Sequence, residues 1–144
     1  MPERVREAAL AWESLLRAQG HLMKTFEAAG DFAPLSPREY DVLFVLDRAG
    51  GAAPMKQLVE GALLTQPSMS RMVDRLEARG ILERRPSPAD RRAVIIALTD
   101  HGADLQRQIG RRHVRTIAQH LSSLSGEELA ALTHICTKLR EGTS

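Results

Sequence analysis

The feature that most constrains this chain of 144 residues is a change of hydrophobic period at Gly80. Before that glycine, apolar residues recur at i, i+3, i+4 and i+7, the spacing of one helix face: Met69, Met72, Val73 and Leu76. After it, residues 81–84 and 93–98 have the composition of two short strands. Residues 86–92 between them are rich in turn formers and too few for anything but a hairpin. The chain is therefore predicted to carry a β-hairpin directly behind a helix that starts near Thr65 or Gln66.

Three helices are predicted on the N-terminal side of this unit. Spacings of three and four predict a long first helix that fades at Gly30, with one face formed by Val5, Ala8, Ala9, Trp12, Leu15, Leu16, Leu22, Met23 and Phe26. The run Ser36-Pro37-Arg38-Glu39 has an N-cap serine, an N1 proline and an N3 glutamate, which form a capping box and open a second helix. That helix stops at the glycine pair 50–51, and a short third helix follows from about Met55.

Two more helices are predicted after the hairpin. Thr99 is placed to cap a long helix, and the run Ser125-Gly126-Glu127-Glu128 is a second capping box that opens the last one. The predicted fold class is therefore mainly α with a small β-hairpin wing (α+β). A chain of this length fits one domain.

Positive charge is concentrated in the predicted helix and hairpin. The net charge of the chain is only +2, but 17 of its 20 basic residues are arginines, and seven of those lie between residues 66 and 92. Four acids lie in the same stretch, so it carries a net +3 and the remainder of the chain −1. Guanidinium groups suit bidentate recognition of phosphate and guanine, so this excess indicates nucleic-acid binding. A solvated arginine-rich surface is the alternative interpretation.

The helix after Thr65 has a polar outer face. Its core stripe leaves Pro67, Ser70, Arg71, Asp74 and Arg75 away from the core, with Gln66 and Ser68 at the helix start. A short helix, a turn, a second helix of this kind and a basic hairpin form a winged helix-turn-helix, in which the second helix enters the major groove of DNA. Small hydroxyl groups at its start allow close approach, and arginines one turn later can hold phosphates. An ordinary exposed amphipathic helix has the same pattern.

The predicted hairpin tip carries Asp90, Arg91 and Arg92. Burial cannot explain two adjacent arginines at a tip, whereas the negative potential of a minor groove favours an arginine. Asp90 is expected to orient the guanidinium by a charge-assisted hydrogen bond. A solvated charged turn is the alternative, and the residues do not decide whether Arg91 or Arg92 enters the groove.

The run from Gln66 to Arg84 resembles the recognition-helix signature of MarR-type regulators, and residues 90–92 with Leu98, Thr99 and Gly102 resemble their wing and its exit. The resemblance extends over nearly the whole chain. It implies a homodimeric repressor on a pseudo-palindromic operator, released by a small aromatic or anionic effector bound between the dimerisation helices and the DNA-binding lobe. Carried over by position, it assigns groove-facing and phosphate roles to Gln66, Ser68, Ser70, Arg71 and Arg75, a wing pair to Asp90 and Arg92, and a strand position near the DNA backbone to Arg84.

The resemblance also divides the chain. Residues 35–99 are expected to form the DNA-binding lobe, and residues 1–30 and 100–144 the dimerisation helices of a single unit spanning 1–144. The terminal helices carry more apolar surface than a small lobe can bury, which independently indicates association. Trp12, His21 and Phe44 are candidates for the effector pocket.

Other classes of function find little support. No nucleophile motif or phosphate loop is present, so no enzyme activity and no cofactor are expected. His113, His120, His134 and the single Cys136 are not spaced for one zinc ion, and Cys136 is expected to be an inert residue on an apolar helix face. With no signal peptide or apolar span, the protein is expected to be cytoplasmic and not membrane-bound. The remaining alternative is a winged-helix module that binds protein, which would expose apolar residues on the helix and wing.

Overall fold

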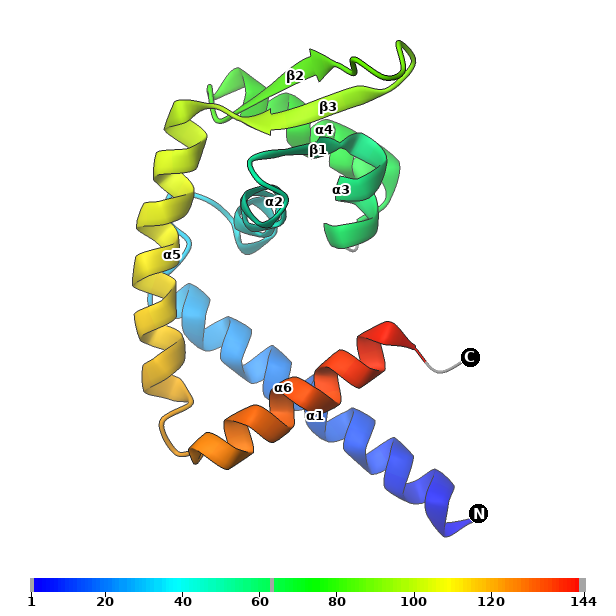
Figure 1. Cartoon of the computed structure of the whole chain (residues 1–144). Coiled ribbons are helices and arrows are strands. Elements are labelled where there is room, and N and C mark those ends of the chain that lie inside the picture. The colour runs from blue at the N-terminus through cyan, green and yellow to red at the C-terminus, as the bar shows by residue number, and fades with distance from the viewer. Residues whose placement is uncertain (1, 63, 143–144) are drawn as a thin grey trace.

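The computed structural model describes residues 2–62 and 64–142 and has a helical frame with a small sheet at one end (Figure 1). The helices are α1 (Glu3–Ala28), α2 (Pro37–Arg48), α3 (Met55–Ala62), α4 (Gln66–Ala78), α5 (Asp100–His120) and α6 (Gly126–Glu141). The strands are β1 (Ala52–Pro54), β2 (Leu82–Pro86) and β3 (Val94–Leu98). The predicted fold class is confirmed, and the order of elements matches the prediction except for β1.

The predicted helix starts are confirmed by their caps. Ser36 and Ser125 each accept a hydrogen bond from the backbone N–H three residues later, and the carboxylates of Glu39 and Glu128 each accept one from the backbone N–H of the cap serine. The hydroxyl group of Thr65 accepts a hydrogen bond from the backbone N–H of Ser68, 3.3 Å away. These bonds satisfy N–H groups that have no partner inside the helix. Each cap uses residues within four positions, which is why the sequence alone located them.

The sheet has three antiparallel strands in the order β1-β3-β2. β2 and β3 form the predicted hairpin, with Leu82 opposite Leu98 and Pro86 opposite Val94. β1 adds a third strand that the sequence did not predict, pairing Ala53 with Ile96. The three residues of β1 end in a proline and show no alternation of apolar and polar side chains, so the sequence gives no strand signal there. β1 forms because β3 offers it a free edge.

The core lies inside the winged-helix lobe. Its buried side chains include Leu43 and Leu46 of α2, Leu58 of α3, the α4 stripe, and Ile96 of β3. α5 contributes Leu105 and Ile109 to the same cluster and then continues away from the lobe toward α1 and α6 (Figure 1). α1 buries only Phe26, and α6 buries no residue. The lobe therefore has a complete core, whereas the two terminal helices do not.

A buried carboxylate ties the connection between α1 and α2 to α5. Asp31 is 1% exposed, and its carboxylate accepts a hydrogen bond from the hydroxyl of Thr116 at 2.8 Å and lies 2.7 Å from Nδ1 of His113. The backbone carbonyl of Asp31 accepts two hydrogen bonds from the guanidinium of Arg112. A buried carboxylate needs such partners. This cluster fixes the position of α5 where it leaves the lobe.

Candidate nucleic-acid interface

The outer face of α4 presents arginines and small hydroxyl groups, as the sequence predicted. Arg71 and Arg75 are exposed, Gln66 is exposed, and Ser68 and Ser70 are half-buried at the edge of the core stripe. The Ser68 hydroxyl is part of the cap, since it accepts hydrogen bonds from Thr65 at 3.0 Å and from Arg71 at 3.5 Å. The start of α4 is therefore a compact hydroxyl cluster with a guanidinium one turn behind it.

The hairpin tip is exposed from Pro88 to Arg92. The carboxylate of Asp90 accepts a hydrogen bond from the backbone N–H of Arg92 at 2.9 Å. This corrects the expectation that Asp90 orients a guanidinium, because the aspartate closes the turn instead, a common use of this side chain. Among the described residues, Arg71, Arg75, Arg91 and Arg92 form no ion pair. Their charges are therefore free to meet an anionic partner.

Arg84 is placed differently from these four arginines. Its guanidinium lies 2.7 Å from Asp74 and 2.9 Å from Glu77, both on α4. Partial burial by itself would lower the pKa of Arg84, but the hydrogen bonds and charges of the two carboxylates outweigh it and raise the pKa above its ordinary value. Arg85, on the opposite face of β2, pairs with Glu83, and Arg79 pairs with Glu39 at 3.6 Å. Three of the seven arginines in this stretch are thus already matched within the chain.

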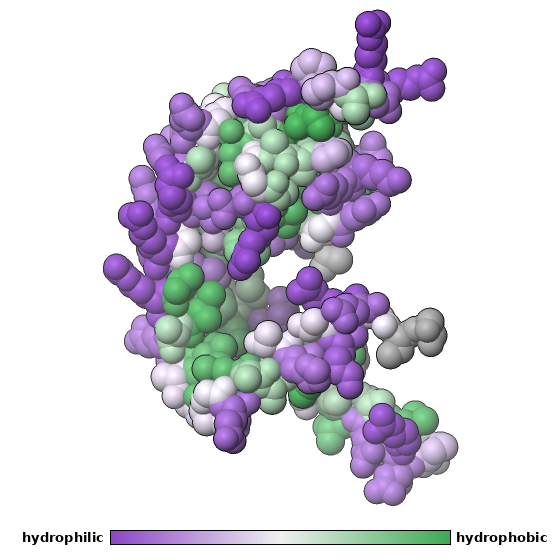
Figure 2. All heavy atoms as spheres, in the orientation of Figure 1, coloured by the Kyte–Doolittle hydropathy of each residue, from purple (hydrophilic) through white to green (hydrophobic). Residues whose placement is uncertain are grey.

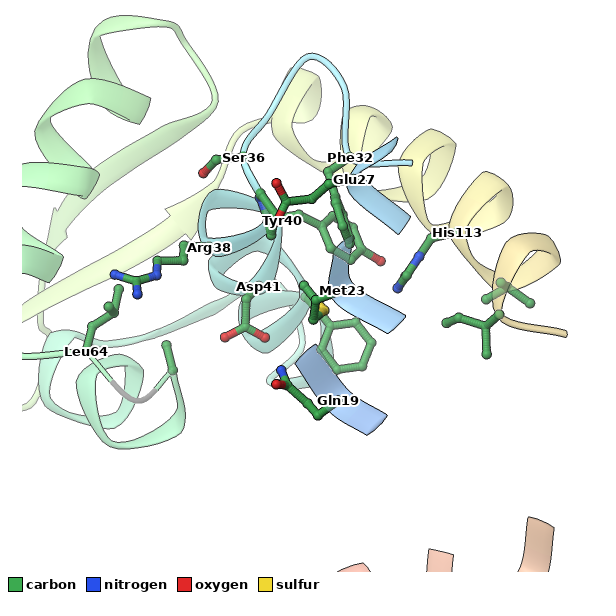
Figure 3. A pocket seen from close by; sticks show the side chains of 15 residues that line it. Gln19, Met23, Glu27, Phe32, Ser36, Arg38, Tyr40, Asp41, Leu64 and His113 are labelled. Carbon is green, nitrogen blue, oxygen red and sulfur yellow. The ribbon is translucent and has the colours of Figure 1, made fainter. Parts of the chain in front are cut away.

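A cavity of about 890 Å³ lies where α1, α2 and α5 meet, beside the lobe (Figure 3). Phe32, Tyr40 and His113 form an aromatic cluster in its wall, with ring centroids 4.7 to 6.0 Å apart. Phe44 also lines the cavity, whereas Trp12 and His21 are exposed and do not line it. Of the three proposed pocket residues, one therefore lies at this cavity within the single chain. His113 and Tyr40 were missed because their approach depends on α5 packing against α2.

Burial shapes the chemistry of this cavity. Burial raises the pKa of the Tyr40 phenol, and a hydrogen bond with Gln106 partly opposes that change. Tyr40 is thus a neutral hydrogen-bonding group at neutral pH. Partial desolvation of its carboxyl group also raises the pKa of Asp41, which lines the cavity but is otherwise exposed. The cavity offers aromatic walls with a few polar groups, the usual composition of a small-molecule site.

Apolar side chains remain exposed on the terminal helices. Nine of the eleven large exposed apolar residues lie on α1, α5 and α6: Val5, Leu10, Trp12, Leu16, Val114, Leu129, Leu132, Ile135 and Leu139. Figure 2 shows the hydrophobic surface over the part of the molecule built by these helices, while the wing end is mostly hydrophilic. Cys136 on α6 is half-buried, not fully buried. The apolar surface thus lies apart from the arginine-bearing surface.

Within residues 2–62 and 64–142, no three histidine, cysteine or acidic side chains are grouped to hold a metal ion. No helix in the described part of the chain is both long enough and apolar enough to cross a membrane.

Comparison with known proteins places this geometry in a family. A family model described as the MarR family matches residues 33–93. The HTH-type transcriptional regulator PecS of Dickeya dadantii (strain 3937) is 38% identical over 96 residues, which cover 65% of this chain and 58% of PecS. The HTH-type transcriptional regulator MhqR of Bacillus subtilis (strain 168) is 33% identical over 105 residues, covering 73% of this chain and 72% of MhqR.

A solved structure extends the likeness to the whole fold. The structure of a MarR mutant from E. coli complexed with operator DNA has a TM-score of 0.74 and 20% identity, and the match covers 94% of this chain and 95% of that one. At this identity the likeness concerns the fold. The winged-helix geometry and the curated relatives agree: the chain belongs to the MarR family of DNA-binding transcriptional regulators, which are not enzymes.

Proposed function

We propose that this protein is a cytoplasmic, homodimeric repressor that binds a pseudo-palindromic operator through α4 and the wing and is released by a small aromatic or anionic effector. The observation that carries the proposal is a set of four exposed arginines on α4 and the hairpin tip that form no ion pair within residues 2–62 and 64–142: Arg71, Arg75, Arg91 and Arg92. α4 and the hairpin lie together at the end of the molecule away from α6 (Figure 1). Free guanidinium groups on such a helix and wing suit phosphates and groove edges.

The two-fold dimer is proposed from the terminal helices. Four apolar residues of α6 recur every three or four positions and are 38 to 63% exposed: Leu129, Leu132, Ile135 and Leu139. A stripe of this kind is covered by another chain in stable proteins. A second copy would cover it with its own equivalent helices and would present a second recognition helix about one DNA turn, roughly 34 Å, from the first. This arrangement favours an operator with two half-sites.

The effector site is proposed at the cavity between α1, α2 and α5. The cavity lies between the winged-helix lobe and the terminal helices whose apolar side chains are exposed, so a ligand there would contact both parts. Phe32, Tyr40 and Phe44 offer ring faces to an aromatic ligand, and His113 offers a polar edge. Figure 3 shows Phe32 from the connection between α1 and α2, Tyr40 on α2 and His113 on α5 around this cavity.

Salt dependence tests the DNA-binding part of the proposal. A duplex selected by the wild-type protein from a random library would be titrated at several salt concentrations. The logarithm of the binding constant should fall linearly with the logarithm of salt, with a slope of several units, because each neutralised phosphate contributes about 0.9. Binding that is indifferent to salt would favour the protein-binding module instead.

A thermal-shift measurement tests the effector site. Benzoate and phenol would be added to the wild-type protein and to Phe44→Ala, with Trp12→Ala as a matched aromatic control outside the cavity. A ligand that binds only the folded state raises the melting temperature. The wild type and Trp12→Ala should show the rise and the Phe44→Ala variant should lose it. A rise that survives in Phe44→Ala and is lost in Trp12→Ala would move the site away from this cavity.

A further inference from the structure

Arg84 lies between the recognition helix and the wing. Side chains on a strand alternate between its two faces, so Leu82 and Arg84 share one face of β2 while Glu83 and Arg85 share the other. Leu82 is 1% exposed, and the side chain of Arg84 is 29% exposed, against 55% for Arg85. The face that holds Arg84 is therefore the one packed toward α4.

Two carboxylates on α4 hold this arginine in place. Nη2 of Arg84 donates to Oδ1 of Asp74 at 2.7 Å, and Nη1 donates to Oε1 of Glu77 at 2.9 Å. The other oxygen of Glu77 accepts a hydrogen bond from the backbone N–H of Arg84 at 3.2 Å. Asp74 and Glu77 are three residues apart and thus neighbours on one face of the helix. Arg84 consequently bonds β2 to α4 through both its side chain and its backbone.

The charge of Arg84 is not available to a phosphate in this arrangement. One cation and two carboxylates carry a net charge of −1, and both terminal nitrogens of the guanidinium already have partners. A phosphate contact would require these charge-assisted hydrogen bonds to break, and bonds of this kind are about twice as strong as neutral ones. Arg71, Arg75, Arg91 and Arg92 have no such ion pairs within the described residues.

We propose that Arg84 is a positioning residue that sets the angle between the wing and α4, and that it does not contact DNA. The hairpin joins α4 through a short turn at Gly80, whose φ of 73° lies in the left-handed region. Beyond Arg84 the strand residues Arg85 and Pro86 are exposed. The bonds from Arg84 to α4 therefore decide where the hairpin tip points. A helix and a wing that enter neighbouring grooves need this angle to be fixed. The inference rests on the proposed DNA-binding role of α4 and the wing.

Asp74→Asn is the decisive variant, because two explanations predict opposite changes in its affinity for DNA. If Asp74 only repels DNA, or if its removal frees Arg84 to reach a phosphate, Asp74→Asn tightens binding to the selected duplex. If Asp74 holds Arg84 to the helix, the same change weakens binding. We expect weakening by roughly tenfold at constant salt, the scale of one interface side chain. The side chain of Asp74 is 63% exposed, so the substitution leaves folding intact.

Arg84 variants add a second readout. Arg84→Ala and Arg84→Lys should both weaken binding, since an ammonium group cannot bridge two carboxylates as the planar fork does. The salt slope should stay at the wild-type value. The double variant Arg84→Ala/Asp74→Asn should bind no more weakly than Arg84→Ala, because the two side chains act as one unit. Arg85→Ala is the matched control on the opposite face of β2 and should have a smaller effect.

Three results would overturn the inference: tighter binding by Asp74→Asn, recovery of affinity in Arg84→Lys, or a salt slope lowered by about 1.8 in Arg84→Ala, the loss of one phosphate contact in each of two subunits. A wild-type protein whose binding ignores salt would instead refute the proposed function. The two failures are therefore distinguishable in the same titration.

Discussion

Gly102→Ala tests how tightly the start of α5 is packed against the turn that leads into the wing. A Cβ atom built on Gly102 would lie 2.1 Å from the backbone oxygen of Ile81, whereas ordinary contacts begin at 3.4 Å. The obstacle is backbone, so no side-chain rotation relieves it. The two segments must separate by the difference, 3.4 − 2.1 = 1.3 Å.

The size of the effect follows from what this separation breaks. Thr99 donates from its backbone N–H to the carbonyl of Ile81 at 3.1 Å and from its hydroxyl to the carbonyl of Gly80 at 2.6 Å. Losing both costs about 2 kcal/mol, and forcing the extra methyl group into a packed site costs about 1–3 kcal/mol. The higher helix propensity of alanine returns about 1 kcal/mol. The variant should therefore be less stable by about 2–4 kcal/mol.

Urea unfolding followed by circular dichroism, at one fixed protein concentration, measures this loss. The midpoint should fall while the m-value stays constant, and the melting temperature should drop by on the order of 10 °C. Gly20→Ala is the matched control, since its Cβ meets nothing within 4 Å in the middle of α1. It should be as stable as the wild type or up to about 1 kcal/mol more stable. A Gly102→Ala variant with the wild-type midpoint would refute the packing argument.

Three further predictions concern DNA, assembly and pH. Arg92→Ala should weaken binding to the selected duplex by about 1–3 kcal/mol and leave the oligomeric state unchanged, whereas equal affinity would remove Arg92 from the interface. Ile135→Asp should convert the dimer to a monomer in analytical ultracentrifugation, while His134→Asp, on the other side of α6, should remain dimeric; a dimeric Ile135→Asp would place the interface elsewhere. The carboxyl group of Asp41 is partly desolvated at the cavity wall although the residue is exposed, and this raises its folded pKa above the ordinary 3.8. Folding therefore favours the protonated carboxyl, whose contribution to stability is full below that pH and is lost as the pH rises through the folded pKa. Asp41→Asn should therefore unfold at higher urea than the wild type near pH 7, with a difference that shrinks toward about pH 4, and a constant difference would contradict this reasoning.

The helices and their starts were predictable from the sequence because their signals are local. The stripe of α4 repeats within eight residues, and the caps at Ser36, Thr65, Thr99 and Ser125 each bind a group three residues away. The hairpin was equally readable, since two short strands flank a turn. The four arginines of α4 and the wing that have no ion pair in the described part of the chain were all among the predicted DNA-binding residues. Their exposure follows from helix period and from a hairpin tip, both of which are sequence patterns.

Tertiary structure decided the features that join distant segments. Asp31 contacts His113 and Thr116, which lie more than eighty residues further along the chain, and the wall of the cavity includes side chains of three helices. No local spacing in the sequence predicts either feature. β1 forms only because the edge of β3 is available to it. Arg84 appears in the sequence as one more cation of a basic stretch, yet the turn at Gly80 brings it back onto α4 and matches it to Asp74 and Glu77. A side chain's charge is a property of the sequence, but whether that charge is free depends on which element packs beside it.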